Sequence, residues 1–325
     1  MRRVLLLFLD GVGLGVDDRR TNPFSNAALP TLRERLGLRT ITASATPHHA
    51  AAASLVAVDA TLGFAGIPQS GTGQAALLTG VNTVALHGRH FGPWVPARLR
   101  DLVRGGSVLA RAQAAGFRCA FANAYPEEVT RPAQDGELPS DAPVPGARAR
   151  KGPAFLRAGP PLAALAAGLL VRHTRSLERG DAVASEITNE AWRERLGRTT
   201  VPSITAACAG RNLARIALDH DLTLFAHYAT DYAGHRQEMA PAVEALERVD
   251  AFLGGVLDAA GDELLTFVVS DHGNIEDVST GHTRNPALGI VIGRGHAAFA
   301  GQLRSLIDVA PLVLDALRRG GGSGL

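Results

Sequence analysis

Short apolar runs alternate with helical patterns of apolar and polar positions along the chain. Strands are predicted for the mostly apolar runs Val4–Leu9, Arg118–Ala122, Leu222–Ala226, Leu265–Ser270 and Gly289–Ile292, with Leu55–Val58 as a possible further strand. Helices are predicted at Gln74–Thr79, Ser107–Ala115, Ile204–Leu218, Ala242–Leu257 and Asp308–Leu317. Apolar strands separated by helices are typical of a parallel sheet that is covered on both faces. The pattern therefore predicts an α/β fold with a doubly wound, mostly parallel sheet.

One segment interrupts this alternation. From about residue 126 to 204 the chain is rich in Pro, Gly, Arg and Ala, and helical patterns occur only around 160–172 and 181–196. A long surface excursion would have a similar composition, but the two helical stretches favour a small inserted cap. We therefore expect a core formed by residues 1–125 and 205–325, with a cap or substrate region at 126–204.

Composition and charge exclude several classes of partner. The 325 residues include 33 basic and 31 acidic side chains, and the net charge of +2 gives no sign of a nucleic-acid or membrane partner. Cys119 and Cys208 are too few for a disulfide framework and fit a reducing compartment. The apolar run near the N-terminus is short for a signal peptide and ends at Asp10. Residues 162–171 are too few to span a bilayer. We expect a cytoplasmic protein.

The stretch IPQSGTGQAALLTGVN, residues 67 to 82, places a serine among small residues where a helix is predicted to begin. Gly71, Gly73 and Ala76 match the dinucleotide pattern G-x-G-x-x-A, but that pattern needs a strand directly before it, and residues 63–68 are broken by glycine and proline. A second interpretation makes Ser70 an ordinary helix cap. A third makes it a nucleophile that a bulky group can approach closely.

Acidic and imidazole side chains follow three of the predicted strands. Asp10 ends the first, ATDYAGH follows the strand LTLFAHY, and SDHGNIED begins where LLTFVVS ends. Parallel α/β sheets bind ligands at the carboxyl ends of their strands, so we expect these side chains at one edge, with Ser70 and His282. Taken singly, Asp10 could cap a helix, and Asp231 with His235 could be a surface pair. The candidate metal ligands are Asp10, Ser70, Asp231, His235, Asp271, His272 and His282.

These donors predict a particular chemistry. Mixed oxygen and nitrogen ligands suit Zn²⁺ or Mn²⁺, and a set of this size suits two ions. A serine hydroxyl is a poor nucleophile unless a base or a metal activates it, and a helix N-terminus favours an approaching anion. The pattern therefore indicates phosphoryl or sulfuryl transfer across a two-metal site.

The motifs FLDGVGLG, the loop ending LLTG, TDYAGH, SDHGNIED and GHTRNP resemble the alkaline phosphatase superfamily. Within it they are similar to the branch of cofactor-independent phosphoglycerate mutase and phosphopentomutase, over roughly residues 1–125 and 205–325. The resemblance implies that this part is a metal-binding catalytic core with two divalent ions. One ion would be held by Asp231, His235 and His282. The other would be held by Asp10, Asp271, His272 and the nucleophile Ser70, with Thr72 as the runner-up nucleophile.

Two departures from the family bear on the substrate. The similar phosphoglycerate mutase loop closes with histidine where this chain has Gln74, and both mutase types carry larger insertions. A formylglycine sulfatase is disfavoured, because the positions of its Pro and Arg are Thr72 and Gln74 here. The favoured function is hydrolysis of a small phosphomonoester through phosphoserine. A phosphomutase is the alternative; a phosphodiesterase, a sulfatase or a non-catalytic binding module fits less well. Arginines of the cap could bind the anionic substrate, namely Arg148, Arg150, Arg157, Arg172, Arg175 and Arg179.

Overall fold

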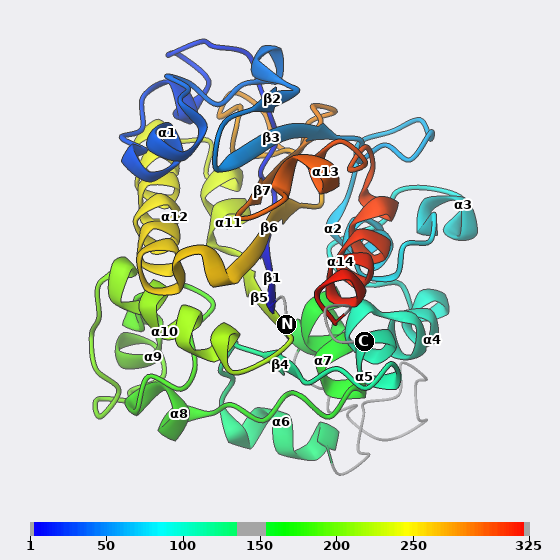
Figure 1. The fold of residues 1–325 in the computed structure, drawn as a ribbon, viewed down its shortest axis with the longest axis vertical. Coiled ribbons are helices and arrows are strands. Elements are labelled where there is room, and N and C mark those ends of the chain that lie inside the picture. Colours follow the sequence, from blue (N-terminus) through cyan, green and yellow to red (C-terminus); the bar gives the residue numbers. More distant parts are fainter. Residues whose placement is uncertain (1–2, 135–153, 322–325) are drawn as a thin grey trace, which may run out of the picture.

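A seven-stranded sheet runs through the middle of the molecule (Figure 1). The computed structural model describes residues 3–134 and 154–321. The strands lie in the order β2-β3-β7-β6-β1-β5-β4. Their bounds are β1 Arg3–Leu9, β2 His48–His49, β3 Ala53–Val58, β4 Cys119–Phe121, β5 Leu222–His227, β6 Leu264–Ser270 and β7 Ala287–Ile292.

The strand directions confirm a mostly parallel α/β sheet. Strands β4, β5, β1 and β6 are parallel neighbours. Strand β7 is antiparallel to both β6 and β3, and the short β2 is antiparallel to β3. Strand β7 reverses because the segment 271–286, which joins it to β6, has no helix that could carry the chain back along the sheet. The reversal leaves this connection at the carboxyl ends of the parallel strands.

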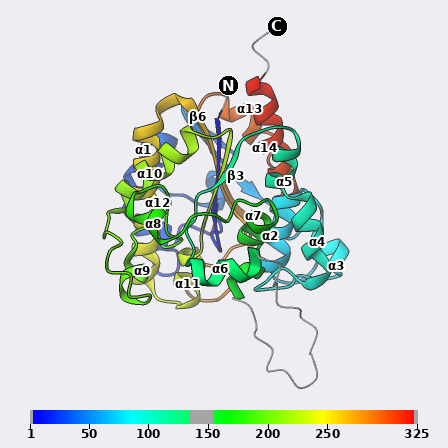
Figure 2. The same cartoon turned by 90° about the horizontal axis from the view of Figure 1, so that it is seen from below.

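Helices cover both faces of the sheet, which Figure 2 shows edge-on. The longer ones are α1 Pro30–Leu36, α2 Ser70–Thr79, α4 Ala97–Gly106, α5 Val108–Ala114, α7 Gly159–Ala166, α10 Ala206–Leu218, α12 Met239–Ala260 and α14 Leu306–Gly321. Helices α1, α10 and α12 form one layer, and α2, α4, α5, α7 and α14 belong to the other. The other helices outside residues 126–204 are η1 Pro23–Ser25, η2 Ala43–Ala45, α3 Thr83–His87, α11 Ala229–His235, η4 Gly261–Glu263 and α13 His296–Ala300.

Strand β1 shows how the apolar sequence produces these two layers. Successive side chains of a strand point to opposite faces, so a strand between two helix layers must be apolar at every position. The side chains of Val4, Leu6 and Phe8 belong to the core beneath α2 and α14. Those of Leu5, Leu7 and Leu9 belong to the core beneath α10 and α12.

The segment expected as a cap contains short helices. They are α6 Glu127–Gln134, η3 Ala154–Arg157, α7, α8 Thr174–Glu178 and α9 Glu190–Glu194. Helix α7 packs against α2, α4 and α5, so this part of the segment adds to the main core. The helix expected around 181–196 is wrong over 181–189. There, Val183 forms a β-bridge with Asn123 beside β4, and its N–H donates to Ala122 O at 2.9 Å, which requires extended backbone.

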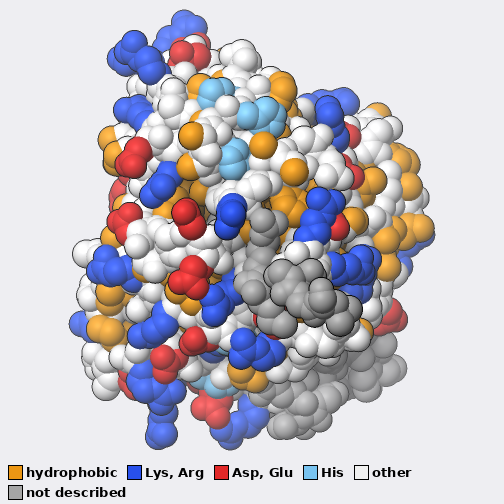
Figure 3. Space-filling model, in the orientation of Figure 1, with side chains coloured by type: hydrophobic (Ala, Val, Ile, Leu, Met, Phe, Trp, Pro, Cys, Tyr) orange, Lys and Arg blue, Asp and Glu red, His pale blue; other side chains and the backbone are white. Residues whose placement is uncertain are grey.

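The described residues contain no helix that is both long and apolar enough to cross a membrane. On the face shown in Figure 3, acidic and basic side chains are interspersed. This distribution agrees with the nearly balanced composition.

Helices α10 and α12 approach each other closely at two glycines. A Cβ added to Gly255 would lie 2.1 Å from Ala207 O, and one added to Gly210 would lie 2.1 Å from Phe252 O. Both contacts are with backbone, which cannot rotate away as a side chain can. The two helices could not keep this spacing with any larger residue at either position.

We therefore predict that Gly255→Ala lowers the free energy of unfolding by about 1–3 kcal/mol, as overpacking of a core does. Gly105→Ala is the control, because its new Cβ on the surface of α4 would have nothing within 4 Å. That change should be neutral or stabilise by up to ~1 kcal/mol through helix propensity. Chemical denaturation measures both, and equal effects would contradict the close packing.

Candidate metal centre

The sheet register places the candidate ligands side by side. Leu9, the last residue of β1, lies opposite His227 of β5 and Ser270 of β6. Asp10 and Asp271, the residues that directly follow β1 and β6, therefore lie next to each other at the edge of the sheet. Asp231 and His235 lie four residues apart in α11, the helix that follows β5, and this spacing puts them on one side of the helix.

Asp231, His235 and His282 form one group of donors. His235 Nε2 lies 3.2 Å from Asp231 Oδ2, and His282 Nε2 lies 3.4 Å from Asp231 Oδ1. The two Nε2 atoms are 3.1 Å apart. The side chain of His235 is 51% exposed, so this group faces solvent. The structure thus brings together the three residues that the resemblance implied for one ion.

A second, buried group contains Asp10, Asp271, His272 and Ser70. His272 Nε2 lies 2.9 Å from Ser70 Oγ, 3.3 Å from Asp10 Oδ1 and 3.7 Å from Asp271 Oδ2. All four residues are buried. Ligand atoms of Asp10, Asp271 and His272 lie within 4.8 Å of one another, a spacing that could hold a metal ion.

The two groups are contiguous. The rings of His272 and His282 stack with centroids 4.1 Å apart. Ligand atoms of Asp231, His272 and His282 also lie within 4.8 Å of one another. His272 could therefore serve either ion, and His235 stands at the open side.

In His272 and His282, hydrogen bonds of Nδ1 to backbone carbonyls leave Nε2 free to bind a metal. His282 Nδ1 lies 3.2 Å from Pro68 O, and His272 Nδ1 lies 3.2 Å from Gly273 O. A carbonyl oxygen only accepts, so each Nδ1 carries the proton in the neutral ring. Nε2 is then the ligand atom on both rings, which is a common outer-shell arrangement at metal sites.

The electrostatics of the buried group fit cation binding. Among the described residues, Asp10 Oδ1 and Asp271 Oδ2 are buried without a hydrogen-bond partner. Burial and the charge of Asp10 hold the pKa of Asp271 well above its usual range. Burial alone would lower the pKa of His272, but Asp271 and Asp10 outweigh it and raise the pKa to about 10. A cation would compensate these carboxylates in place of the proton.

Outer contacts hold the ligands in place. Glu276 Oε2 accepts from Gly13 N at 2.9 Å and from Asn274 N at 2.7 Å. Asn274 Nδ2 in turn donates to Asp231 Oδ1 at 2.6 Å. A Cβ on Gly13 would lie 2.4 Å from the Glu276 carboxyl, so this approach requires glycine. Sequence reasoning did not single out Glu276 or Asn274, although both lie within SDHGNIED.

Gln74 connects the buried group to the inserted segment. Its Nε2 donates to Asp10 Oδ2 at 3.1 Å, and its Oε1 accepts from Gly159 N, at the start of α7, at 2.8 Å. The residue is 1% exposed. In the sequence, Gln74 is notable only because the similar mutase loop has histidine at this position. Its contacts with Asp10 and Gly159 are visible only in the structure.

The contacts of Ser70 and Thr72 differ. Helix α2 begins at Ser70 rather than at the predicted Gln74, and Ser70 Oγ reaches His272. Thr72 Oγ1 instead accepts from Phe91 N at 3.2 Å, and Thr72 N donates to Phe91 O at 2.9 Å. The Thr72 amide is therefore already used and is not available to an anion. These contacts favour Ser70 as the nucleophile, which stays a prediction.

The candidate substrate arginines have other contacts. Arg172 donates to Asp181 O at 2.9 Å and to Phe121 O at 3.1 Å, and Arg179 pairs with Asp181 at 2.9 Å. Arg157 lies in η3 and Arg175 in α8. Arg148 and Arg150 lie outside the described residues. Because its guanidinium donates to two backbone carbonyls, Arg172 is suited to linking the inserted segment to β4.

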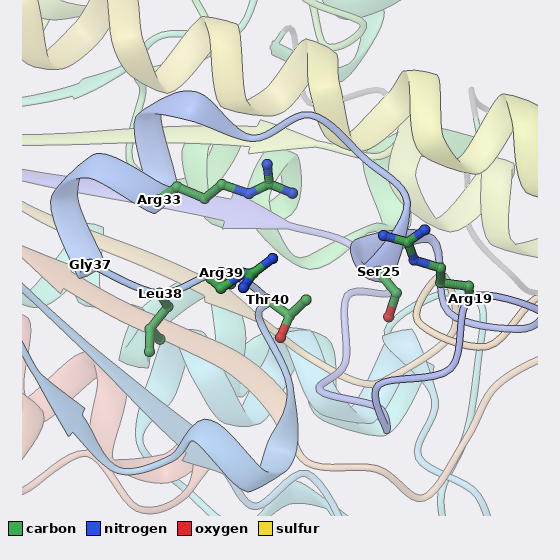
Figure 4. Close-up of a pocket in the computed structure, with 7 residues that line it drawn as sticks. All are labelled: Arg19, Ser25, Arg33, Gly37, Leu38, Arg39 and Thr40. Carbon is green, nitrogen blue, oxygen red and sulfur yellow. The ribbon is translucent and has the colours of Figure 1, made fainter.

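A cavity of about 440 Å³ lies beside α1 (Figure 4). Its lining is Arg19, Ser25, Arg33, Gly37, Leu38, Arg39 and Thr40. The guanidinium groups of Arg19, Arg33 and Arg39 extend toward the same space. None of the lining residues belongs to the two donor groups, so this cavity is not the metal centre.

Comparisons with known proteins show which families part of this chain is similar to. Residues 203–319 match the sequence model of the Metalloenzyme superfamily. The 2,3-bisphosphoglycerate-independent phosphoglycerate mutase of Desulforudis audaxviator (strain MP104C) is 36% identical over 106 residues, 30% of this chain and 21% of that protein. That of Thiobacillus denitrificans (strain ATCC 25259 / T1) is 37% identical over 106 residues, 29% of this chain and 20% of that protein. The aligned stretch thus spans about a fifth of these relatives.

One solved structure shows a similar fold. The PH0037 protein from Pyrococcus horikoshii has a TM-score of 0.56 at 13% identity, over 100% of this chain and 99% of that chain. The alkaline phosphatase from the Antarctic bacterium TAB5 has a TM-score of 0.47 at 11% identity, over 98% and 99%. The family match and the curated relatives confirm the predicted resemblance. The chain is similar to the Metalloenzyme superfamily over residues 203–319 and, over 106 residues, to 2,3-bisphosphoglycerate-independent phosphoglycerate mutases.

We predict that metal affinity decreases as the pH is lowered. The proton on His272, whose pKa without a metal is about 10, must leave before Nε2 binds a cation, so binding releases a proton and acid opposes it. Affinity for Zn²⁺ or Mn²⁺ should drop about tenfold per pH unit for each proton released. Titration calorimetry between pH 8 and pH 6, in two buffers of different ionisation enthalpy, measures both quantities.

A matched pair of variants controls this experiment. Asp271→Asn should weaken binding strongly, whereas Asp277→Asn should not. Both remove one carboxylate from the same loop, but Asp277 accepts from Ser279 N and Ser279 Oγ, not from the cluster. Equal affinities for the two variants, or an affinity independent of pH, would contradict the site.

Proposed function

We propose that this protein is a two-metal phosphoryl-transfer enzyme that hydrolyses a small phosphomonoester through a phosphoserine on Ser70. The observation that carries the proposal is the position of Ser70 Oγ, 2.9 Å from His272 Nε2 and at the edge of the carboxylate and imidazole cluster. A buried hydroxyl at a helix N-terminus, beside a site built for cations, is suited to attack an anionic phosphorus centre.

The metals would be held by the residues of the two groups. Asp231, His235 and His282 would bind one ion, and Asp10, Asp271, His272 and Ser70 the other. Bound divalent ions would supply Lewis-acid stabilisation of the phosphoryl oxygens and of the serine alkoxide. Glu276, Asn274 and Gln74 would fix the orientation of the ligands through the hydrogen bonds described above.

Two displacements at phosphorus complete the reaction. In the first, Ser70 Oγ loses its proton and forms a bond to phosphorus, while the bond from phosphorus to the substrate oxygen breaks and that oxygen leaves as an alcohol after taking up a proton. In the second, water attacks the phosphoserine, Ser70 Oγ regains a proton and inorganic phosphate departs. The chain contributes the nucleophile, its position and the exclusion of bulk water from a buried hydroxyl.

A mutase is the second candidate. In it, a hydroxyl of the same substrate takes the phosphoryl group in place of water. The similarity to phosphoglycerate mutases over 106 residues favours it. The short insertion favours hydrolysis, because a mutase must keep water from its phosphoenzyme while the intermediate reorients.

Ser70→Ala should abolish most turnover, by several powers of ten as in other nucleophile knockouts, while metal content and fold survive. Thr72→Val is the comparison: it should keep the phosphoenzyme, although losing the hydrogen bonds to Phe91 should lower stability. Mass spectrometry of acid-trapped protein should place the phosphate on Ser70. A phosphate on Thr72, or full activity of Ser70→Ala, would refute the assignment.

Turnover in ¹⁸O-labelled water distinguishes the two candidates. Hydrolysis predicts label in inorganic phosphate at the full rate of substrate loss, because water attacks the phosphoserine in every cycle. An isomerised phosphoester with little free phosphate would show that the mutase reaction is the correct one.

A further inference from the structure

The cavity beside α1 gathers positive charge, and no acidic residue is among the seven that line it (Figure 4). The guanidinium groups of Arg19, Arg33 and Arg39 extend toward the same space. Like charges repel, so three such groups around one cavity are unfavourable unless an anion between them compensates their charge. The arrangement is therefore that of an anion site.

Two of these arginines have no partner in the described part of the chain. Within residues 3–134 and 154–321, the side chains of Arg19 and Arg39 form no hydrogen bond or ion pair. Arg33 Nη2 donates to Ala27 O at 3.0 Å, which is a backbone carbonyl rather than a carboxylate. The complete fork of N–H donors on Arg19 and on Arg39 is thus available to a ligand.

Acidic side chains near the cavity do not neutralise it. Asp18 pairs with Arg20 at 2.8 Å, and the Asp250 carboxylate accepts from two backbone amides at the start of α1, at 3.0 and 2.8 Å. Among the described residues, Asp17 is the one carboxylate that forms a hydrogen bond with the lining, because its Oδ1 accepts from Ser25 Oγ at 2.7 Å. Three guanidinium groups against this one carboxylate leave the lining positively charged.

The backbone that carries the three arginines is held in place. Asn26 Nδ2 donates to Arg19 O at 2.8 Å. Helix α1 is capped by Gly37, whose N–H donates to Arg33 O at 2.8 Å and whose φ of 66° lies in the left-handed region. This turn changes the direction of the chain, so that Arg33 and Arg39 both line the cavity. A ligand would have to order side chains only, which limits the entropy lost on binding.

The rest of the lining indicates the kind of anion that fits. Thr40 supplies a hydroxyl, Leu38 is the only large apolar side chain of the lining, and no aromatic ring is present. A nucleobase would therefore find no ring to stack on. Guanidinium groups bind phosphate oxygens through paired N–H donors, and three of them suit a ligand with several phosphate groups. The volume of about 440 Å³ is within the range of small-ligand pockets.

This cavity is separate from the metal centre. Helix α1 belongs to the same helix layer as α10 and α12, whereas Ser70 lies at the start of α2, in the other layer. None of the lining residues is a candidate metal ligand. A molecule bound beside α1 would therefore not be the ester that Ser70 attacks.

We propose that the cavity beside α1 is a second ligand site, which binds a short chain of phosphate groups, a diphosphate or a triphosphate, through Arg19, Arg33 and Arg39. The recognised group is the phosphate chain, whether it is free or part of a larger molecule such as a nucleoside triphosphate. Binding here needs neither Ser70 nor the metal ions.

Titration calorimetry of the metal-loaded protein with tripolyphosphate tests this site. The probe is saturated with Mg²⁺ so that it does not remove the bound metals. Arg19→Ala and Arg39→Ala should each weaken binding about ten- to a hundredfold, as expected for loss of a charge-assisted hydrogen bond. The thermal midpoint of unfolding without probe should stay unchanged, since neither side chain has a partner among the described residues. Equal affinity of the wild type and both variants would overturn the proposal.

Arg104→Ala is the matched control for charge. It removes a guanidinium from the surface of α4, where Arg104 pairs with Asp101 at 2.8 Å. It should change the affinity for tripolyphosphate by less than about twofold, because salt screens distant exposed charges. A loss as large as that of Arg39→Ala would show that only the overall charge matters, and the proposal would be wrong.

Asp271→Asn separates the cavity from the metal centre. This variant lacks a candidate metal ligand, so tripolyphosphate binding that survives in it and depends on Arg39 supports a separate site. Binding that is lost in Asp271→Asn but retained in Arg39→Ala would place the probe at the metal centre and overturn the proposal.

Mg²⁺-saturated ATP, which carries the same triphosphate chain with a nucleoside attached, shows which group is recognised. If the arginines bind the phosphate chain, ATP should bind no more than about tenfold tighter than tripolyphosphate. Both probes should weaken in Arg39→Ala. A larger preference for ATP would mean that the nucleoside is recognised, and the assignment of the ligand would fail.

Discussion

Crowding of negative charge at the carboxyl ends of the strands constrains the rest of this structure. Asp10 and Asp271 are buried next to His272, and among the described residues no hydrogen-bond donor reaches one oxygen of each carboxylate. Burying carboxylates in this way is unfavourable unless cations or protons compensate them. The surrounding structure therefore holds the ligands by rigid means: the register of three parallel strands, the backbone amides that Glu276 fixes and the close approaches of Gly11 and Gly13.

The sequence was informative about the donors because strand ends are easy to locate. Runs such as LLTFVVS are apolar at nearly every position, so the polar residue that follows each run marks the sheet edge. Parallel neighbours then bring Asp10 and Asp271 together without further information. Glu276 and Asn274 gave no such signal, because an outer contact depends on how the loop after β6 folds back. The same loop makes β7 run antiparallel to β6, and the direction of a strand cannot be predicted from its apolar sequence alone.

The inserted segment shows where periodicity fails. Residues 181–189 have the spacing of a helix, yet Val183 forms a bridge beside β4 and the buried His227 imidazole binds Ser185 O at 2.7 Å. These tertiary contacts outweigh a weak local preference. The arginines of this segment were predicted from charge alone, which does not distinguish a substrate contact from a guanidinium, such as that of Arg172, that binds backbone carbonyls.

Gln74 has a consequence for how this architecture could be divided. Its amide donates to Asp10 and accepts from the first residue of α7, so rotating it by half a turn would break both contacts. The inserted segment therefore supplies one end of a chain of contacts that begins at a candidate metal ligand. Deleting the segment, or exchanging it for another insertion, would remove the donor to the Gln74 carbonyl and loosen the amide that donates to Asp10. Core and insertion are not independent modules, and a change of substrate range by grafting would need residue 74 replaced together with the graft.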